Sequence, residues 1–171
     1  MSFIGLVTGG ARSGKSRHAE AQVLAMGGTP IYIATAEARD GEMTDRIAQH
    51  RKDRGEGWTT IEEPHDLKGA LDRTDGAGPR LVDCLTLWLS NRMLADADLG
   101  AEVSNLCDTL MAQSSPVWLV TNEVGSGIVP ANELGRAYRD ACGTMNQRIG
   151  AIATRVDLVV CGQTLTIKGG S

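Results

Sequence analysis

The sequence lacks the features that mark several large classes of protein. Basic residues are not in excess, because 17 Lys and Arg stand against 21 Asp and Glu and the net charge is −4. A broad nucleic-acid interface needs a basic face, so we expect no nucleic acid among the partners. No apolar run approaches the ~20 residues that span a membrane, and the run at residues 3–8 is too short for the core of a signal peptide. We therefore expect a cytoplasmic protein without a membrane span.

Cysteine pairs and internal repeats are also missing. The four cysteines, at positions 84, 107, 142 and 161, are widely spaced and form no Cys-x-x-Cys pair. Free, buried thiols are the expected state in the cytoplasm, with a metal or disulfide role as the alternative. The chain does have 171 residues, of which 42% are hydrophobic, enough for one compact domain that buries ~70% of its unfolded surface. We predict a single domain over residues 1–171.

Short apolar runs alternate with helical patterns along the chain. The predicted strands cover residues 3–8, 30–34, 80–84, 116–121, 158–161 and 165–168. The predicted helices cover residues 15–26, 42–53, 85–94, 103–113 and 134–156. Strands that alternate with helices predict a mostly parallel sheet flanked by helices, and the last two strands predict an antiparallel C-terminal edge hairpin around residues 162–164. The expected fold class is α/β.

Ligands of such sheets bind beyond the carboxyl ends of the strands. Four segments follow predicted strands in this position, at residues 9–16, 34–40, 83–85 and 122–127. The polar, glycine-containing and acidic residues of the chain concentrate in them. The topology alone therefore predicts where the binding site lies.

The first of these segments has the pattern of a phosphate-binding loop, G-x-x-x-x-G-K-[ST]. It consists of Gly9, Gly10, Ala11, Arg12, Ser13, Gly14, Lys15 and Ser16. Glycines let backbone N–H groups point at phosphate oxygens, the following helix offers its positive N-terminus, and Lys15 reaches the β- and γ-phosphates. A chance match in a glycine-rich turn is the alternative, but the strand before it and the helix after it favour the loop. The sequence thus predicts a P-loop NTPase-like domain that binds a purine nucleoside triphosphate.

Two oxygen ligands are predicted for a Mg²⁺ ion on that nucleotide. The hydroxyl of Ser16 can complete the coordination of a magnesium ion that sits on phosphate oxygens. The second ligand is expected to be an acid at the end of a strand, and Asp83 fits that position. The alternative role of Asp83 is the N-cap of the following helix, and the two roles are compatible.

One predicted helix carries a stripe of basic residues around a histidine. Arg46, His50 and Arg54 stand four residues apart and therefore share a face. Neighbouring cations disfavour the imidazolium ion, so His50 is expected to be neutral and nucleophilic, while the same cations attract a triphosphate. Such a histidine can attack phosphorus. Taken alone, the simpler interpretation is a solvated histidine, which also suits His18 and His65.

These motifs together resemble the family of bifunctional adenosylcobinamide kinase/adenosylcobinamide-phosphate guanylyltransferases. The resemblance covers residues 4–168, and the combined series in this order is specific, although the phosphate loop alone is generic. It is carried by TGGARSGKSR at 8–17, YIAT at 32–35, D-x-E-M-x-x-R-I-x-x-H-x-x-x-R at 40–54, W-x-T-x-E at 58–62, DCLT at 83–86, VTNEVG at 120–125, G-x-V-P at 127–130, YRD at 138–140 and G-x-x-N-Q at 143–147.

The resemblance implies two reactions in the assembly of adenosylcobalamin. A kinase step uses ATP or GTP to phosphorylate the aminopropanol hydroxyl of adenosylcobinamide. A transferase step then takes GMP from GTP, holds it on a histidine and passes it to adenosylcobinamide phosphate, which gives adenosylcobinamide-GDP. The guanylylated histidine of the family corresponds to His50 here, so the implied catalytic residues are His50 and Lys15. The resemblance also implies a homotrimer.

The nucleotide contacts that the resemblance implies extend beyond the phosphate loop. They are Ala34, Thr35, Ala36, Arg51, Lys52, Asp53, Arg54, Glu62, Asp83 and Cys84. Glu62 is expected to accept hydrogen bonds from guanine, with a surface charge as its alternative. Glu123 is expected to orient a substrate hydroxyl or the metal, with loop capping as its alternative. The glycines at 41, 55 and 57 are expected to act as hinges of the His50 helix, or simply as turn residues.

Two segments depart from the family pattern. Residues 154–157 read Thr-Arg-Val-Asp where an Ala-Asp-Glu-like run is expected, and Gly-Gln-Thr at 162–164 replaces a more usual Gly-Leu-Pro. Both lie far from the motifs in sequence, so we expect them to alter the edge strands rather than the chemistry. Two rival functions remain, a small-molecule kinase without a covalent intermediate and a non-enzymatic nucleotide switch.

Overall fold

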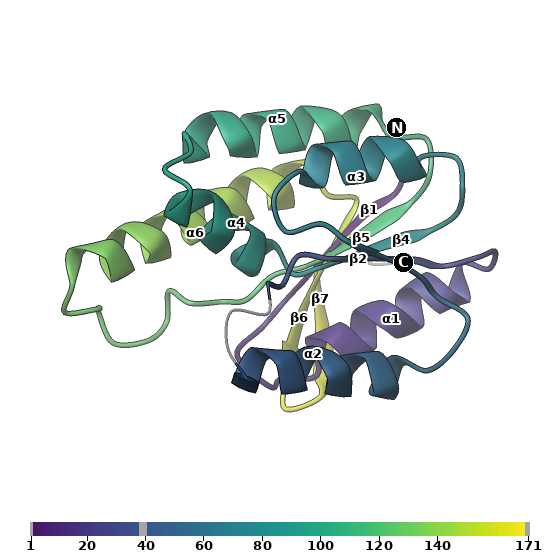
Figure 1. Cartoon of the computed structure of the whole chain (residues 1–171), viewed down its shortest axis with the longest axis horizontal. Coiled ribbons are helices and arrows are strands. Elements are labelled where there is room, and N and C mark those ends of the chain that lie inside the picture. Colours follow the sequence, from purple (N-terminus) through teal and green to yellow (C-terminus); the bar gives the residue numbers. More distant parts are fainter. Residues whose placement is uncertain (1, 38–40, 170–171) are drawn as a thin grey trace.

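A single seven-stranded sheet organises the chain (Figure 1). The computed structural model describes residues 2–37 and 41–169, and within helix α2 the side chains at 42, 43, 46 and 53 lie outside that description. The strands are β1 Ile4–Thr8, β2 Ile31–Ala34, β3 Thr59–Glu62, β4 Arg80–Asp83, β5 Val117–Val120, β6 Arg155–Val160 and β7 Gln163–Lys168. Their order across the sheet is β3-β2-β4-β5-β1-β6-β7. Strands β1 to β6 are parallel and β7 is antiparallel to β6, which confirms the predicted α/β fold.

Helices cover both faces of the sheet, as Figure 1 shows. They are α1 Lys15–Ala25, α2 Gly41–Arg54, α3 Leu67–Thr74, α4 Leu85–Leu94, α5 Leu99–Ala112 and α6 Glu133–Ile152. Successive side chains of a strand point to opposite faces. On β1, Leu6 packs with α3 to α6 on one face, while Val7 packs with α1 on the other. The buried strands therefore read as continuous apolar runs, which is why the sequence indicated them.

Two elements were not predicted from the sequence, and one predicted helix is too long. Strand β3 lies at the edge of the sheet and is only partly buried. Helix α3 has only 8 residues, and its N-cap Asp66 accepts a hydrogen bond of 2.8 Å from the N–H of Gly69. The predicted helix 134–156 ends at Ile152, and β6 begins at Arg155. The order of strands and helices is otherwise as predicted.

The C-terminal hairpin turns more tightly than expected. Cys161 and Gly162 form the whole connection between β6 and β7, with φ angles of 52° and 75°. Two residues with positive φ are typical of the turn type that matches the twist of a hairpin. Cys161 is exposed in this turn, so the prediction of a buried thiol is wrong for it and confirmed for the other three cysteines. All four are free, as expected.

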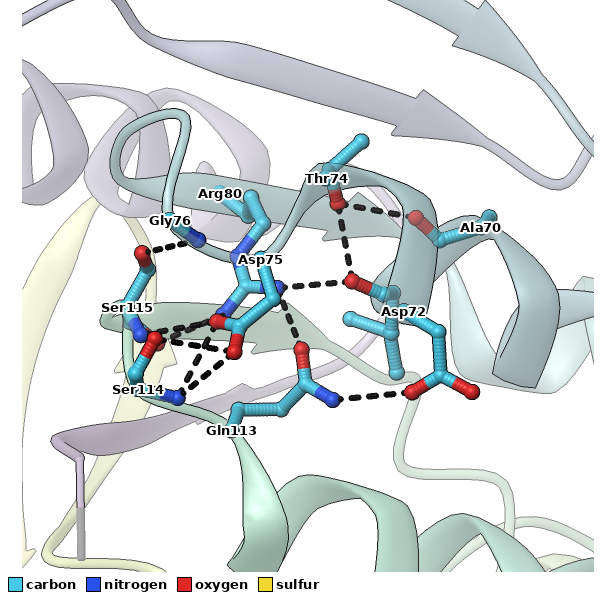
Figure 2. A network of polar contacts seen from close by, with 10 residues as sticks. Ala70, Asp72, Thr74, Asp75, Gly76, Arg80, Gln113, Ser114 and Ser115 are labelled. Carbon is cyan, nitrogen blue, oxygen red and sulfur yellow. Dashed lines mark hydrogen bonds and ion pairs between the residues drawn. The ribbon is translucent and has the colours of Figure 1, made fainter.

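A buried arginine ties together the amino ends of β4 and β5, opposite the predicted site. The side chain of Arg80 is fully buried. Its guanidinium donates to the carbonyl oxygens of Leu71 and Ser115 at 3.0 and 2.6 Å and to Gln113 Oε1 at 2.5 Å (Figure 2). It also forms an ion pair of 3.2 Å with Asp75. This network joins the loop before β4 to the loop before β5.

The helices give no indication of a membrane span. Within residues 2–37 and 41–169, none of them is both long enough and apolar enough to cross a bilayer.

Candidate nucleotide-binding site

A cavity of about 280 Å³ lies at the carboxyl ends of the parallel strands. All four segments predicted from the topology contribute to its walls, and the remaining lining residues come from β2, α2, β3 and α4. The lining residues are Lys15, Ser16, Tyr32, Ala34, Ala36, Ile47, His50, Arg51, Arg54, Thr60, Glu62, Asp83, Cys84, Leu87 and Asn122. The phosphate loop and the histidine helix therefore face one common space.

The phosphate loop has the backbone that its glycines were expected to permit. Gly14 has a φ of 98° and Arg12 a φ of 56°, so left-handed conformations recur within the loop. Such turns gather successive N–H groups into a concave anion site. A Cβ atom on Gly9 would lie 2.4 Å from the carbonyl oxygen of Val159, a backbone atom that cannot move aside. Gly9 is therefore required by space as well as by the motif.

Contacts from distant segments hold the loop in place. The N–H of Glu123 donates to the carbonyl of Gly9 at 3.1 Å, and the N–H of Gly162 donates to the carbonyl of Ser13 at 2.9 Å. The ammonium group of Lys15 donates to the carbonyl of Gly10 at 2.9 Å, so it lies against the loop itself. Gly162 belongs to a segment that departs from the family pattern. That segment was expected to affect only the edge strands, yet it packs on the phosphate loop.

The second departing segment also reaches the phosphate-loop helix. His18 on α1 lies 2.8 Å from the buried carboxylate of Asp157 on β6, which Arg155 also contacts at 3.0 Å. Burial alone would raise the pKa of Asp157, but the hydrogen bonds from Arg155 and His18 lower it overall. The expectation of a solvated His18 is therefore wrong. His65 is more exposed and pairs with Glu37 at 2.6 Å.

Asp83 lies at the end of β4, where the predicted metal ligand is expected, and it is held by a tyrosine. Its Oδ2 accepts a hydrogen bond of 2.6 Å from the hydroxyl of Tyr32. The N-cap of α4 is Cys84 rather than Asp83, so the capping alternative is wrong. Ser16 and Asp83 line the same cavity, and magnesium is usually bound through one or two protein oxygens together with phosphate oxygens. The residues present therefore fit the predicted ion.

The end of helix α2 is attached to the edge of the sheet by two arginines. Arg51 forms an ion pair of 2.5 Å with Glu62 on β3. The guanidinium carbon of Arg54 lies 3.5 Å from the ring centroid of Tyr32, and its Nη2 donates to Thr60 Oγ1 at 3.0 Å. His50 stands one turn before Arg54 and lines the cavity. The side chain of Arg46, the third member of the predicted stripe, lies outside the described residues.

A buried polar network supports the floor of the cavity. The hydroxyl of Thr35 donates to the carbonyl of Cys84 and accepts from its N–H, at 2.7 and 2.8 Å. Asn91 donates to the carbonyl of Thr35 at 2.9 Å, and Asn122 donates to Thr86 Oγ1 at 2.7 Å. These bonds fix the ends of β2, β4 and β5 relative to one another.

The structure brings most of the predicted site residues to the cavity. The predicted contacts that line it are Lys15, Ser16, Ala34, Ala36, His50, Arg51, Arg54, Glu62, Asp83 and Cys84. Thr35 is fully buried beneath it, and the exposed Lys52 does not line it. Residues 9–14 form the loop beside it. The side chain of Asp53 lies outside the described residues, as does the end of segment 34–40.

Sequence reasoning missed five lining residues, and for four of them a signal was present. Tyr32, Ile47, Thr60 and Asn122 all lie within the motifs that carry the family resemblance, whereas Leu87 belongs to none. Glu123, in contrast, caps its own loop, because its carboxylate accepts from the N–H groups of residues 125 and 126 at 2.6 and 3.2 Å. The loop-capping alternative is the one that the structure bears out.

Comparison with known proteins decides the family. A family model described as cobinamide kinase / cobinamide phosphate guanyltransferase matches residues 5–167. The chain belongs to this family. The bifunctional adenosylcobalamin biosynthesis protein CobP of Pseudomonas aeruginosa is 46% identical over 167 residues, which cover 96% of each chain. The corresponding protein CobU of Escherichia coli is 39% identical over 179 residues, which cover 95% of this chain and 98% of the relative.

Solved structures support the fold alone. The flagellar accessory protein FlaH of Methanocaldococcus jannaschii superposes with a TM-score of 0.54 at 10% identity, over 99% of this chain and 81% of that one. An ATPase from a bacterial type III secretion system also gives 0.54, at 11% identity, over 96% of this chain and 56% of that one. The family and the P-loop fold predicted from the sequence are thus both confirmed.

Proposed function

We propose that this chain catalyses two consecutive reactions of adenosylcobalamin biosynthesis. It phosphorylates adenosylcobinamide with ATP or GTP, and it then transfers GMP from GTP to the resulting phosphate. The observation that supports the proposal most strongly is the common cavity, which joins the phosphate loop to His50 in a chain of this family.

The phosphate loop and its surroundings supply the binding of the triphosphate. Backbone N–H groups of the phosphate loop, the N-terminus of α1 and the ammonium group of Lys15 all favour an anion. Ser16 and Asp83 would hold Mg²⁺, which neutralises charge on the phosphate oxygens when it is bound. Each of these groups stabilises negative charge that develops as a phosphorus–oxygen bond breaks.

In the transferase step, His50 acts as the nucleophile. Its ring nitrogen forms a bond to the α-phosphorus of GTP as the bond from that phosphorus to the bridging oxygen breaks and pyrophosphate leaves. An oxygen of adenosylcobinamide phosphate then attacks the same phosphorus, and the imidazole leaves with a proton on its ring. Arg51 and Arg54 line the same cavity and would stabilise both transition states.

The carboxylate of Glu62 is a candidate acceptor for guanine. It is 65% exposed and bonds only to Arg51 among the described residues. The N1 and N2 donors of guanine could replace that arginine as its partner, which would release the Arg51 guanidinium to the phosphates. The ion pair between Arg51 and Glu62 is therefore compatible with an exchange in which GTP binding gives Glu62 the guanine and Arg51 the phosphates as new partners.

The kinase step needs attack at the γ-phosphorus, so the substrates must be placed differently in the two steps. Helix α2 is the element that would move. Gly41 begins it, and Gly55 and Gly57 follow it with φ angles of 74° and 99°. These two are ordinary turn positions that can also serve as the hinge. We also propose a cytoplasmic homotrimer, for which the resemblance to the family provides the support.

Product analysis with two histidine variants tests the function. Wild-type protein given adenosylcobinamide, GTP and Mg²⁺ should yield the phosphate and then the GDP-linked product. His50→Ala should accumulate the phosphate and form none of the second product, whereas His65→Ala should behave like wild type, because His65 lies outside the cavity. Formation of the phosphate alone by the wild type would favour a simple kinase. Absence of both products, with nucleotide-dependent binding of a partner, would favour a switch.

A further inference from the structure

We propose that Tyr32 is a positioning residue that serves both halves of the site. Its hydroxyl fixes the carboxylate of Asp83, and its ring fixes Arg54 and with it the end of the helix that carries His50. The inference rests on the proposed function, since it assigns Asp83 to the metal and His50 to the nucleophile.

The hydroxyl of Tyr32 fixes the orientation of the Asp83 carboxylate. Tyr32 is 4% exposed and donates to Asp83 Oδ2 at 2.6 Å. Among the side chains that the structure describes, no other one bonds to this carboxylate. Tyr32 therefore occupies one oxygen of Asp83 and leaves the other for a ligand.

The aromatic ring of Tyr32 anchors the end of helix α2 through Arg54. The Arg54 guanidinium lies 3.5 Å from the centroid of the Tyr32 ring, a distance at which a cation is attracted to an aromatic face. Trp58 packs against the same ring edge-on, with centroids 5.9 Å apart. The Nε atom of Arg54 is buried without a hydrogen-bond partner among the described residues. The position of the Arg54 guanidinium thus depends on the face of the Tyr32 ring and on the hydrogen bond to Thr60.

Tyr32 contacts both Arg54, on the helix that carries the nucleophile, and Asp83, the predicted metal ligand. His50 and Arg54 are one turn apart on α2 and lie near each other on the helix surface. Any movement of His50 by this helix must carry Arg54 along or strain its contact with Tyr32. Because Tyr32 is bonded to Asp83, its ring and hydroxyl link the position of the helix to the metal site.

Two substitutions separate the roles of the ring and the hydroxyl. Tyr32→Phe keeps the aromatic face and removes the bond to Asp83, whereas Tyr32→Leu removes both. Tyr138→Phe is the matched control, because Tyr138 is the other tyrosine of the chain and its hydroxyl donates to the backbone carbonyl of Thr86 at 2.8 Å in a partly buried setting. Arg54→Met removes the cation and leaves Tyr32 in place.

Hydrogen exchange tests the ring without nucleotide or metal. Amides of α2 should exchange at the wild-type rate in Tyr32→Phe and several times faster in both Tyr32→Leu and Arg54→Met. Wild-type exchange in Arg54→Met would overturn the anchoring role, even if Tyr32→Leu does not fold.

Binding of a fluorescent GTP analogue tests the hydroxyl without turnover. The Mg²⁺ concentration that gives half of the metal-dependent increase in affinity should rise roughly fivefold in Tyr32→Phe, and it should stay unchanged in Tyr138→Phe. An unchanged value in Tyr32→Phe would refute the orienting role. Since neither measurement needs catalysis, a failure of the proposed reactions would appear separately, as missing products with the wild type.

Discussion

The buried Arg80 network gives a prediction whose size follows from the structure. Asp75→Asn removes the ion pair with Arg80 and weakens the acceptor for the N–H groups of Ser114 and Ser115, which now bond its carboxylate at 2.9 to 3.0 Å. Burial alone would raise the pKa of Asp75, but the bonds from Ser115 and Ser114 and the charge of Arg80 hold it at about 2, below its usual 3.8. The carboxylate is therefore more favourably placed in the folded chain than in the unfolded one.

The lowered pKa of Asp75 determines how much Asp75→Asn should reduce the free energy of unfolding. A depression of this size corresponds to roughly 2 kcal/mol, and because the side chain of Asp75 is 26% exposed we expect about 1–2 kcal/mol after screening by solvent. Arg80→Met should cost about 3–5 kcal/mol, since it leaves buried carbonyls and a carboxylate without their cation. The cavity lies at the opposite end of the strands, so nucleotide affinity should not change in either variant.

The direction of the pH dependence follows from the lowered pKa. The contribution of Asp75 is fully present above its unfolded pKa near 3.8, and it disappears as the pH falls through the folded value of about 2. Urea unfolding of wild type and Asp75→Asn should therefore differ most at neutral pH, with a gap that narrows between about pH 4 and pH 2. A gap that is absent at pH 7, or that stays constant down to pH 2, would refute this assignment.

Two further predictions concern the phosphate loop and its helix. Gly9→Ala should abolish GTP binding in a titration, because its Cβ would lie 2.4 Å from the carbonyl of Val159, whereas Gly10→Ala, whose Cβ meets no protein atom within 4 Å, should bind GTP more tightly than Gly9→Ala. Equal binding by both would contradict the packing argument. Asp157→Asn should lower the free energy of unfolding by about 2–4 kcal/mol, because it weakens a buried acceptor of His18. A thermal melting curve like that of the wild type would show that this cluster contributes little.

The sequence predicted the parts of the fold that depend on local pattern. The buried strands β1, β2, β4 and β5 are apolar runs, and the phosphate loop is a contiguous motif. Strand β3 was missed because an edge strand buries little. The start of β6 was missed because Asp157 places a charge in the middle of the strand, where only its contacts with His18 and Arg155 make burial possible.

Most residues of the candidate site were predicted from the sequence, but their contacts with one another were not. Lys15, Ser16 and Asp83 could be assigned from spacing and from the ends of strands. The role of Tyr32 could not, because it depends on the meeting of residues 32, 54 and 83, which only the fold brings together. The same holds for Gly162, which is distant from the phosphate loop in sequence and bonded to it in space.

The most direct measurement of the central claim is the fate of the α-phosphate of GTP on the protein. After incubation with α-labelled GTP and denaturation, the account predicts a label that survives base, is lost in acid and maps by mass spectrometry to His50. GTP labelled at the γ-phosphate should leave nothing attached, and His50→Ala should take up no label while His65→Ala does. The account would be contradicted by label on another residue, or by complete turnover to the GDP-linked product with no label on the protein.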